Sequence, residues 1–355
     1  MHFLRPLGMK WTMLPTWVVL STDPVGAQLV CYEGFAEYAA GAQVESGGNG
    51  SAGTGLDGGF GWGGAYDVSD FIKTLVKIEN RTTSPVNYTN GEITIPGGNR
   101  ALRFYDVANG SFALQRPLGT VFGAAAGDTL WFSVLFRTTS AGMLANQDVF
   151  QIGFDDSAPT GTQRVSIGAA TISTTYPSAF QFFARTTADV SASAYHSSLP
   201  IVAATTYLLV GCIQPHAGVY DTVSLFVNPS TLDDPGPPSA SVTLSSGLTT
   251  LSQAFIRTVG LDLNDAYVLD EWRIGRDYGS VVQSLRGALQ VLRDSDLLTL
   301  RWPVALTGVV LETSATLEPD SWRELTGPFP QVGNHYEYPI LIVPEIPRAF
   351  FRLRR

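Results

Sequence analysis

The first candidate for chemistry in this sequence is Asp270, within the stretch V-L-D-E-W-R-I-G at residues 268–275. Strict alternation along a strand predicts that Asp270 shares one face with Val268, Trp272 and Ile274. A carboxylate among large apolar side chains must be hydrogen-bonded, paired with a cation or bound to a metal, because burying it bare is costly. We therefore expect a central strand whose acid ties down the ends of a domain.

Other acidic residues carry weaker signals. Glu271 and Arg273 would share the opposite face of the same strand, and we expect them to pair weakly at the surface. Asp155 and Asp156 follow a predicted strand, where turn or calcium chemistry is a better interpretation than catalysis. Glycoside hydrolysis needs two carboxylates that flank a groove, one of them held protonated. Neither group forms a convincing catalytic pair.

Three polar residues, Gln151, Gln181 and Arg185, occupy predicted strands that are rich in Phe. They could line a concave sheet and bind a ligand, with Tyr195 and His196 close by in a polar loop. The alternative, which we favour, is that both glutamines satisfy sheet edges and that His196 is merely exposed.

Aromatic residues offer another route to ligand binding. The Gly-rich segment 41–64 is not followed by the Lys-Ser/Thr of a phosphate-binding loop, and we interpret it as a long surface loop that delivers Phe60 and Trp62 to the sandwich. Trp62 and Tyr66, with Trp131, could stack on sugar rings. Such residues more often belong to the hydrophobic core, which we expect of Trp131. Trp62 is therefore the better candidate for stacking on a sugar ring.

Several other chemistries find little support. The chain has four His, one of them in the N-terminal segment, so a His-based zinc site is not indicated. The G-x-S-x-G motif of serine esterases is absent from the sequence. Cys31 and Cys212 each lie in an apolar strand pattern, and we expect buried rather than nucleophilic thiols. Whether they form one bridge stays open, although two cysteines make no disulfide scaffold.

Composition favours a β-rich globular protein. The chain has 355 residues, 36 Gly and 21 Pro, and 15% of its residues are charged, so strands and turns are favoured over helices. Residues 28–285 hold 12 Lys and Arg against 22 Asp and Glu. This acidic balance argues against nucleic acid or anionic lipid as the main partner. It also disfavours strongly anionic polysaccharides, unless one local basic groove binds them.

The N-terminus resembles an export signal. Arg5 and Lys10 precede the apolar run W-T-M-L-P-T-W-V-V-L-S, and Val25-Gly26-Ala27 resembles a small-residue cleavage site. The run is too short to span a bilayer. We expect a signal peptide at residues 1–27 and an exported protein, at the cell surface, in the periplasm or outside the cell, without an integral membrane segment.

Many short strands separated by turn residues predict two antiparallel sheets packed face to face. After Gly275 we expect a linker with one short helical turn at most, and then a small β domain from about residue 288. The predicted strands of the large region are 28–35, 71–78, 101–105, 129–137, 149–154, 164–169, 179–185, 207–214, 222–228, 256–261 and 267–274.

Five segments resemble the laminin-G-type, concanavalin A-like lectin/glucanase sandwiches of exported bacterial proteins. They are C-Y-E-G-F-A-E-Y-A-A-G at 31–41, G-F-G-W-G-G-A-Y at 59–66, W-F-S-V-L-F-R at 131–137, D-T-V-S-L-F-V-N-P at 221–229 and L-D-E-W-R-I-G at 269–275. The resemblance implies an all-β, two-sheet antiparallel jelly-roll sandwich over residues 28–280, a linker at 281–287 and a small β-sandwich domain at 288–355.

The resemblance also implies that the two ends of the sandwich lie close together. Since calcium prefers carboxylate and carbonyl oxygens, we expect Glu33 and Asp270 to hold a structural Ca²⁺. The alternative is that Asp270 accepts hydrogen bonds from backbone N–H groups or from an arginine. Members of this superfamily include lectins, hydrolases, lyases and adhesion modules, and fold alone does not choose among them. The E-x-D-x-E motif of the related glucanases is missing here.

The leading functional hypothesis is non-catalytic binding of carbohydrate by Trp62, Tyr66, Gln151, Gln181 and Arg185, on a scaffold stabilised by calcium. The alternatives are a polysaccharide-degrading hydrolase or lyase on the same sandwich, and a structural adhesin.

Overall fold

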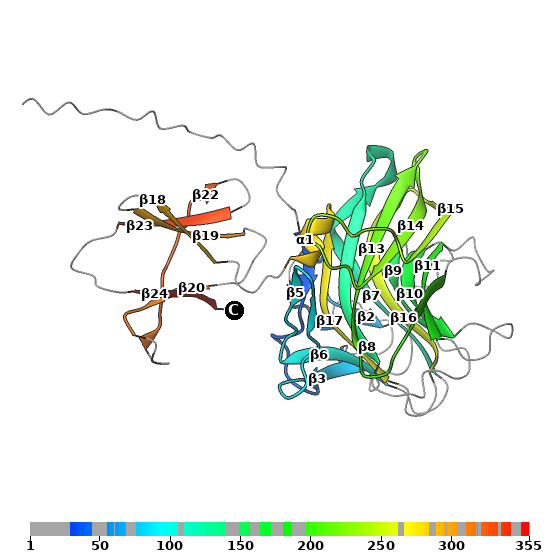
Figure 1. Ribbon diagram of the computed structural model, residues 1–355, viewed down its shortest axis with the longest axis horizontal. Coiled ribbons are helices and arrows are strands. Elements are labelled where there is room, and N and C mark those ends of the chain that lie inside the picture. Colours follow the sequence, from blue (N-terminus) through cyan, green and yellow to red (C-terminus); the bar gives the residue numbers. More distant parts are fainter. Residues whose placement is uncertain are drawn as a thin grey trace, which may run out of the picture.

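The computed structural model describes residues 29–44, 55–59, 61–68, 76–105, 110–138, 149–156, 164–171, 180–186, 196–261, 266–283, 289–294, 297–303, 310–316, 318, 321–332, 335–341 and 349–354. The predicted signal peptide lies outside these residues. In the described part of the chain, two large antiparallel sheets lie face to face (Figure 1). The predicted all-β sandwich is therefore confirmed.

The first sheet has eight strands among the described residues. Their order is β15-β14-β13-β8-β17-β6-β3, and β1 pairs with the end of β17. The bounds are β1 Leu29–Glu33, β3 Val76–Asn80, β6 Arg100–Tyr105, β8 Leu130–Thr138, β13 Thr206–His216, β14 Val219–Val227, β15 Ala240–Leu248 and β17 Ala266–Gly275.

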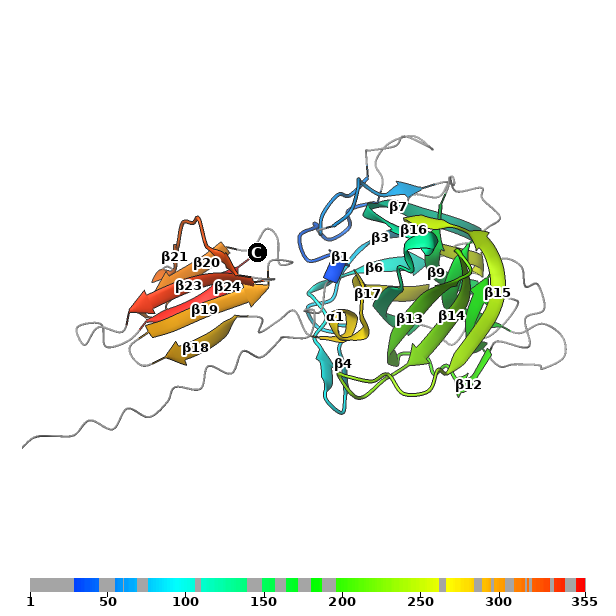
Figure 2. The same cartoon turned by 90° about the horizontal axis from the view of Figure 1, so that it is seen from above.

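The second sheet has seven strands among the described residues, in the order β12-β11-β10-β9-β16-β7-β2. Figure 2 gives a second view of the two layers. The bounds are β2 Asp67–Val68, β7 Gly110–Gly123, β9 Val149–Asp155, β10 Val165–Thr171, β11 Phe180–Thr186, β12 His196–Pro200 and β16 Thr250–Leu261.

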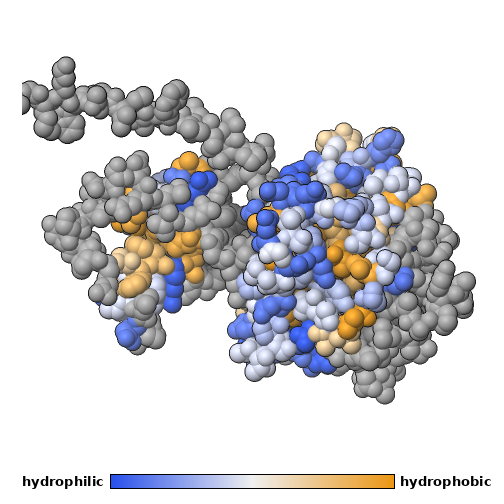
Figure 3. All heavy atoms as spheres, in the orientation of Figure 1, coloured by the Kyte–Doolittle hydropathy of each residue, from blue (hydrophilic) through white to orange (hydrophobic). Residues whose placement is uncertain are grey.

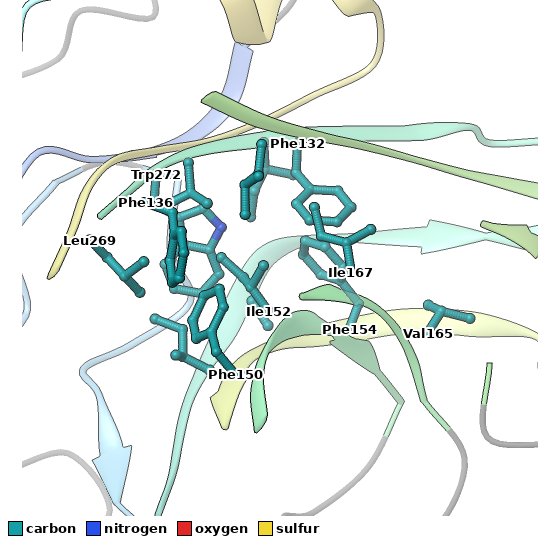
Figure 4. Close-up of a cluster of buried hydrophobic side chains, with 14 of the residues drawn as sticks. Phe132, Phe136, Phe150, Ile152, Phe154, Val165, Ile167, Leu269 and Trp272 are labelled. Carbon is teal, nitrogen blue, oxygen red and sulfur yellow. The ribbon is translucent and has the colours of Figure 1, made fainter. Parts of the chain in front are cut away.

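The main core fills the space between the sheets, where aromatic side chains of β8 and β9 interdigitate (Figure 4). The rings of Phe136 and Phe150 stack with centroids 4.9 Å apart, and those of Phe132 and Phe154 meet edge to face at 4.9 Å. Burying each such side chain contributes about 1.5–3 kcal/mol. The alternation of β9 therefore fixes which of its residues point inward.

The outer side of the eight-stranded sheet is covered by a second apolar cluster. The hairpin of β4, Tyr88–Asn90, and β5, Ile93–Ile95, packs there together with helix α1, Tyr278–Val282. The carboxylate of Asp277 caps the helix by accepting a hydrogen bond from Ser280 N at 2.8 Å. Because this sheet is buried on both faces, all ten residues of β17 are buried.

The alternation predicted for β17 is wrong at its centre. A bulge interrupts its register with β8 between Asp270 and Arg273, and Glu271 has a φ of 54°. An inserted residue reverses the faces that follow it. Asp270 therefore lies on the hairpin side with Val268, whereas Trp272 and Ile274 join the core between the sheets.

The described residues between 289 and 354 form smaller sheets around a separate apolar cluster that includes Leu300, Trp302 and Leu311. One sheet contains β18 Gln290–Asp294, β19 Leu297–Pro303, β23 His335–Leu341 and β22 Gln331–Val332. The other contains β21 Arg323–Glu324, β20 Val310–Ser314 and β24 Phe350–Arg354. These strands agree with the small additional β unit expected from the sequence.

Among the described helices, none has the length and apolar character needed to cross a membrane. In the view of Figure 3, hydrophilic residues cover much of the visible sandwich surface, and the hydrophobic patches on it are separate from one another.

The two cysteines provide a test of this arrangement. Cys31 belongs to the core between the sheets and Cys212 to the cluster under the hairpin, and both are free thiols. Burial raises the pKa of each to about 12, so little thiolate forms at neutral pH. We predict that neither reacts with a thiol reagent in the native protein and that both react after unfolding. Isolation of a Cys31–Cys212 disulfide would contradict the fold.

Candidate functional site

A buried ion pair closes one end of the sandwich. Glu33 ends β1, and its carboxylate accepts hydrogen bonds from Arg116 Nη1 at 2.7 Å, Tyr38 Oη at 2.8 Å and Phe35 N at 2.9 Å. The side chains of Glu33 and Arg116 are 0% and 1% exposed. Burial raises the pKa of Glu33 to about 7, with Glu37 adding to the rise and Arg116 opposing it. The ion pair joins β1 to the inward side of β7.

The same arginine holds the Gly-rich segment in place. The Arg116 guanidinium lies 4.7 Å from the ring centroids of both Trp62 and Tyr66, and its Nη2 donates to Gly58 O at 2.8 Å. Gly61 has a φ of 80°, and a Cβ there would lie 1.9 Å from the Val30 carbonyl oxygen, so this position requires glycine. The described part of the segment thus packs against β1, and Trp62 reaches the core as expected, whereas Phe60 lies outside the described residues.

These contacts do not suit the predicted stacking role of Trp62 and Tyr66. Tyr66 is 1% exposed and belongs to the core. Trp62 is half-buried, donates from Nε1 to Tyr32 O at 3.1 Å and contacts the Trp272 ring at 5.0 Å. Their rings are already engaged within the protein, so we place the ligand elsewhere.

The carboxylates of Glu33 and Asp270 do not fit the expected calcium ion. The oxygens of Glu33 face hydrogen-bond donors and a guanidinium group, which would repel a cation. Asp270 accepts hydrogen bonds from Gly98 N and Glu271 N, both at 2.8 Å, as the alternative interpretation expected. Among the described residues, no group of three His, Cys, Asp or Glu side chains could hold a metal ion.

Glu271 and Arg273 do pair, at 2.6 Å, but the expected surface location is wrong. Arg273 is 0% exposed, because the hairpin and α1 cover this side of β17. Tyr32 Oη donates to Glu271 at 3.0 Å. This pair is therefore a buried part of the scaffold.

The outward side of the seven-stranded sheet carries a different set of residues, which we call the polar face. Alternation places Phe150, Ile152 and Phe154 of β9 in the core, so Gln151, Gly153 and Asp155 point to the other side. Neighbouring strands follow the same register. The polar face comprises Gln115, Gln151, Asp155, Arg164, Ser166, Gln181, Phe183, Arg185, Gln253, Phe255 and Arg257.

Three predicted binding residues thus lie on one surface, since Gln151, Gln181 and Arg185 all belong to the polar face. The favoured alternative, that the glutamines satisfy sheet edges, does not hold for Gln151, because β9 lies between β10 and β16. Gln151 is 3% exposed. Among the described residues, its Oε1 atom and that of Gln253 accept no hydrogen bond. Buried amides of this kind usually have partners, so these two are candidates for contacting a ligand.

Arginines missed by the sequence analysis complete this surface. Arg164 precedes β10, and its guanidinium lies 5.3 Å from the Phe255 ring centroid. Burial lowers the pKa of Arg164, as does repulsion from Arg257 and Arg185, while Asp155 raises it. The three arginines and Asp155 therefore lie within electrostatic reach of one another. These residues are far apart in the sequence, and they meet because β9 pairs in the sheet with β16, which follows it by about 100 residues.

The polar face lacks a close pair of carboxylates among its described residues. Asp155 lies on β9, and Asp67 on β2 pairs with Gln115 on β7. Three strand intervals separate β2 from β9, which is roughly 14 Å. Glycosidases hold their two carboxyl groups about 5–10 Å apart, a separation that Asp67 and Asp155 do not match. His196 begins β12, and Tyr195 lies outside the described residues.

Comparison with known proteins yields a distant likeness. No protein-family model matches the chain, and no curated protein matches it significantly. Among solved structures, peanut lectin with a nine-residue peptide is 11% identical, with 56% of this chain and 96% of that chain covered and a TM-score of 0.34. Lectin II from Ulex europaeus is 8% identical, with coverages of 57% and 93% and a TM-score of 0.35.

An alginate lyase in complex with alginate trisaccharide is 12% identical, with 54% of this chain and 87% of that chain covered and a TM-score of 0.37. At such TM-scores the likeness supports no conclusion about ligand or activity.

Replacing Glu33 tests the ion pair. At pH 8, above the pKa of Glu33, the substitution Glu33→Gln leaves the buried Arg116 charge without its partner, and we expect a loss of about 3–5 kcal/mol in the free energy of unfolding. Asp57 also contacts Arg116 but is 65% exposed, so Asp57→Asn should cost less than about 1 kcal/mol. Urea denaturation measures both. Equal stability of the two variants would contradict a structural role for the pair.

Chelation tests the surroundings of the two acids. Because Glu33 and Asp270 are occupied by hydrogen-bond donors, we predict that EDTA leaves the thermal unfolding midpoint unchanged and that added calcium does not raise it. A calcium-dependent rise that Asp270→Asn abolishes would restore the metal site.

Proposed function

We propose that the chain is an exported carbohydrate-binding protein whose ligand lies on the polar face. The observation that carries this proposal is the contrast between the two sheets. The outer side of the eight-stranded sheet is covered by an apolar hairpin and helix, whereas the seven-stranded sheet turns amide, guanidinium and aromatic groups outward. The predicted signal peptide supports export.

The residue types of the polar face suit a saccharide. Amide and guanidinium groups supply directional hydrogen bonds to hydroxyl groups, as in most small-molecule sites. Phe183 and Phe255 lie beside them on the same side of the sheet, but both rings are buried, at 5% and 2% exposed, so the polar groups would make the ligand contacts. Each ring lies over a glycine: a Cβ on Gly168 would approach Phe183 to 2.8 Å, and one on Gly153 would approach Phe255 to 2.9 Å. The small residues thus leave room for the rings on this face.

A screen of the full chain against immobilised glycans, followed by binding isotherms, tests the proposal. Replacing Gln151 or Gln181 by Ala removes one hydrogen-bonding group each, and we expect affinity to fall roughly two- to tenfold. Gln214 is exposed at the end of β13 in the other sheet, so Gln214→Ala is a matched control that should bind normally. Absence of binding to any glycan, or equal binding by all variants, would contradict the proposal.

A polysaccharide lyase is the second candidate function, because the arginines of the polar face suit a lyase better than a hydrolase. Elimination beside a sugar carboxylate needs groups that neutralise the carboxylate and a base that removes a proton. Arg164, Arg185 and Arg257 have the chemistry for the first task. His196, paired with Phe183 in the register, is of the residue type for the second.

Ultraviolet absorbance of unsaturated products after incubation with acidic polysaccharides measures lyase activity. Such products from the native chain, lost in His196→Ala, would establish the lyase. Binding without product formation would establish the non-catalytic role.

A further inference from the structure

We propose that a tetrahedral oxyanion, phosphate or sulfate, binds between Arg81 and Arg137 beside the hydroxyl group of Ser84. This place is on the outward side of the eight-stranded sheet, where the chain turns from β3 toward the hairpin β4–β5. It belongs to the opposite sheet from the polar face, so the inference does not depend on the proposed carbohydrate-binding function.

The basic side chains of this site come from three parts of the chain. Arg103 of β6 and Arg137 of β8 both pair with Val268, one on each side of β17, so they stand on the same side of the sheet as Val268. Val268 packs in the apolar cluster under the hairpin, which identifies this side as the outward one. Arg81 follows β3 in a turn in which Ser84 N donates to Arg81 O at 3.0 Å. We call Arg81, Arg103 and Arg137 the Arg81 cluster.

One carboxylate is shared within this cluster. Glu79 pairs with Arg81 Nη2 at 2.6 Å and with Arg103 Nη1 at 2.8 Å. Arg137 differs, because its Nη1 donates to Ser84 Oγ at 3.3 Å and its guanidinium contacts no carboxylate of the described residues. Asp270, two residues after Val268, already accepts hydrogen bonds from two backbone N–H groups. The charge of Arg137 is therefore left without a counter-charge in contact.

The electrostatics of Arg81 agree with this reading of the contacts. Burial lowers the pKa of Arg81, Glu79 raises it, and repulsion from Arg137 and Arg103 lowers it. The positive charge of Arg137 thus reaches Arg81. An anion placed between the two guanidinium groups would replace this repulsion with attraction to both.

The groups of the site are partly open to solvent. The side chains of Arg81 and Arg103 are 11% and 33% exposed, and Arg137 and Ser84 are half-buried. Partial burial strengthens an interaction between charges because water screens it less. A small ion can therefore reach these groups and be held by them.

The donors indicate the shape of the anion. Because Ser84 Oγ accepts a hydrogen bond from Arg137, its own O–H is a donor for another group. Arg81 and Arg137 add N–H donors from two further elements of the chain. A planar carboxylate is satisfied by the fork of one guanidinium group, whereas the oxygens of a tetrahedral ion can meet donors from several directions. Phosphate and sulfate have this shape.

Isothermal titration calorimetry of the full chain, at pH 8 and constant ionic strength, tests the site with phosphate, methyl phosphate, sulfate and the control anion chloride. We expect one phosphate or sulfate ion per chain, bound roughly tenfold or more tightly than chloride, as charge-assisted hydrogen bonds imply. Comparison of phosphate with methyl phosphate shows whether the site binds the free ion alone or also a phosphate ester.

Variants assign the binding to the Arg81 cluster. We expect Arg137→Gln to weaken phosphate binding roughly tenfold to a hundredfold and Ser84→Ala roughly two- to tenfold. Arg137→Lys keeps the charge but loses the planar fork, so it should retain part of the affinity. Arg323 is exposed on β21, and Arg323→Gln is a control with the same charge change. Circular dichroism and unfolding midpoints confirm that each variant folds.

The outcomes separate this inference from the proposed function. Phosphate and sulfate that bind no more tightly than chloride would overturn the oxyanion site and leave carbohydrate binding on the polar face in place. Unchanged phosphate affinity in folded Arg137→Gln, or an equal loss in Arg323→Gln, would overturn the assignment to the Arg81 cluster.

Discussion

Both faces of the eight-stranded sheet are buried, one against the seven-stranded sheet and the other against the hairpin β4–β5 and helix α1. Apolar burial on two sides accounts for the continuous apolar runs in its strands. It also leaves the seven-stranded sheet as the layer whose outward residues can be polar. The proposed binding surface is placed on that layer for this reason.

Strand β7 links the scaffold to the polar face. Arg116 points inward to Glu33 and the Gly-rich segment, whereas Gln115, its neighbour, points outward beside Phe255. Because adjacent residues of a strand face opposite sides, the ion pair fixes the position of β7 and thereby one edge of the proposed binding surface. The buried pair of Glu33 and Arg116 thus holds the end of the sandwich together, a role that the sequence analysis assigned to a calcium ion.

Much of the fold could be predicted from alternation and turn residues, including β8, β9, β13 and the helical turn after Gly275. Strands β7 and β15 were missed, because Arg, Pro and Gly interrupt the pattern of the first and Ser and Thr dilute that of the second. The bulge at Glu271 could not be predicted from the sequence, because alternation assumes a strand with an unbroken register. Of the candidate site, Gln151, Gln181 and Arg185 were found, whereas Arg164 and Arg257 require the pairing of β9 with β10 and β16.

The most direct measurement is a crystal structure of the full chain with an oligosaccharide that it binds in the glycan screen. We expect electron density for the sugar along β16, β9, β10 and β11, with sugar oxygens within hydrogen-bond distance of Gln151, Gln181 or Arg185. Density for the sugar over the hairpin side of the sandwich, or on the sheets of residues 289–354, with the polar face empty, would contradict it.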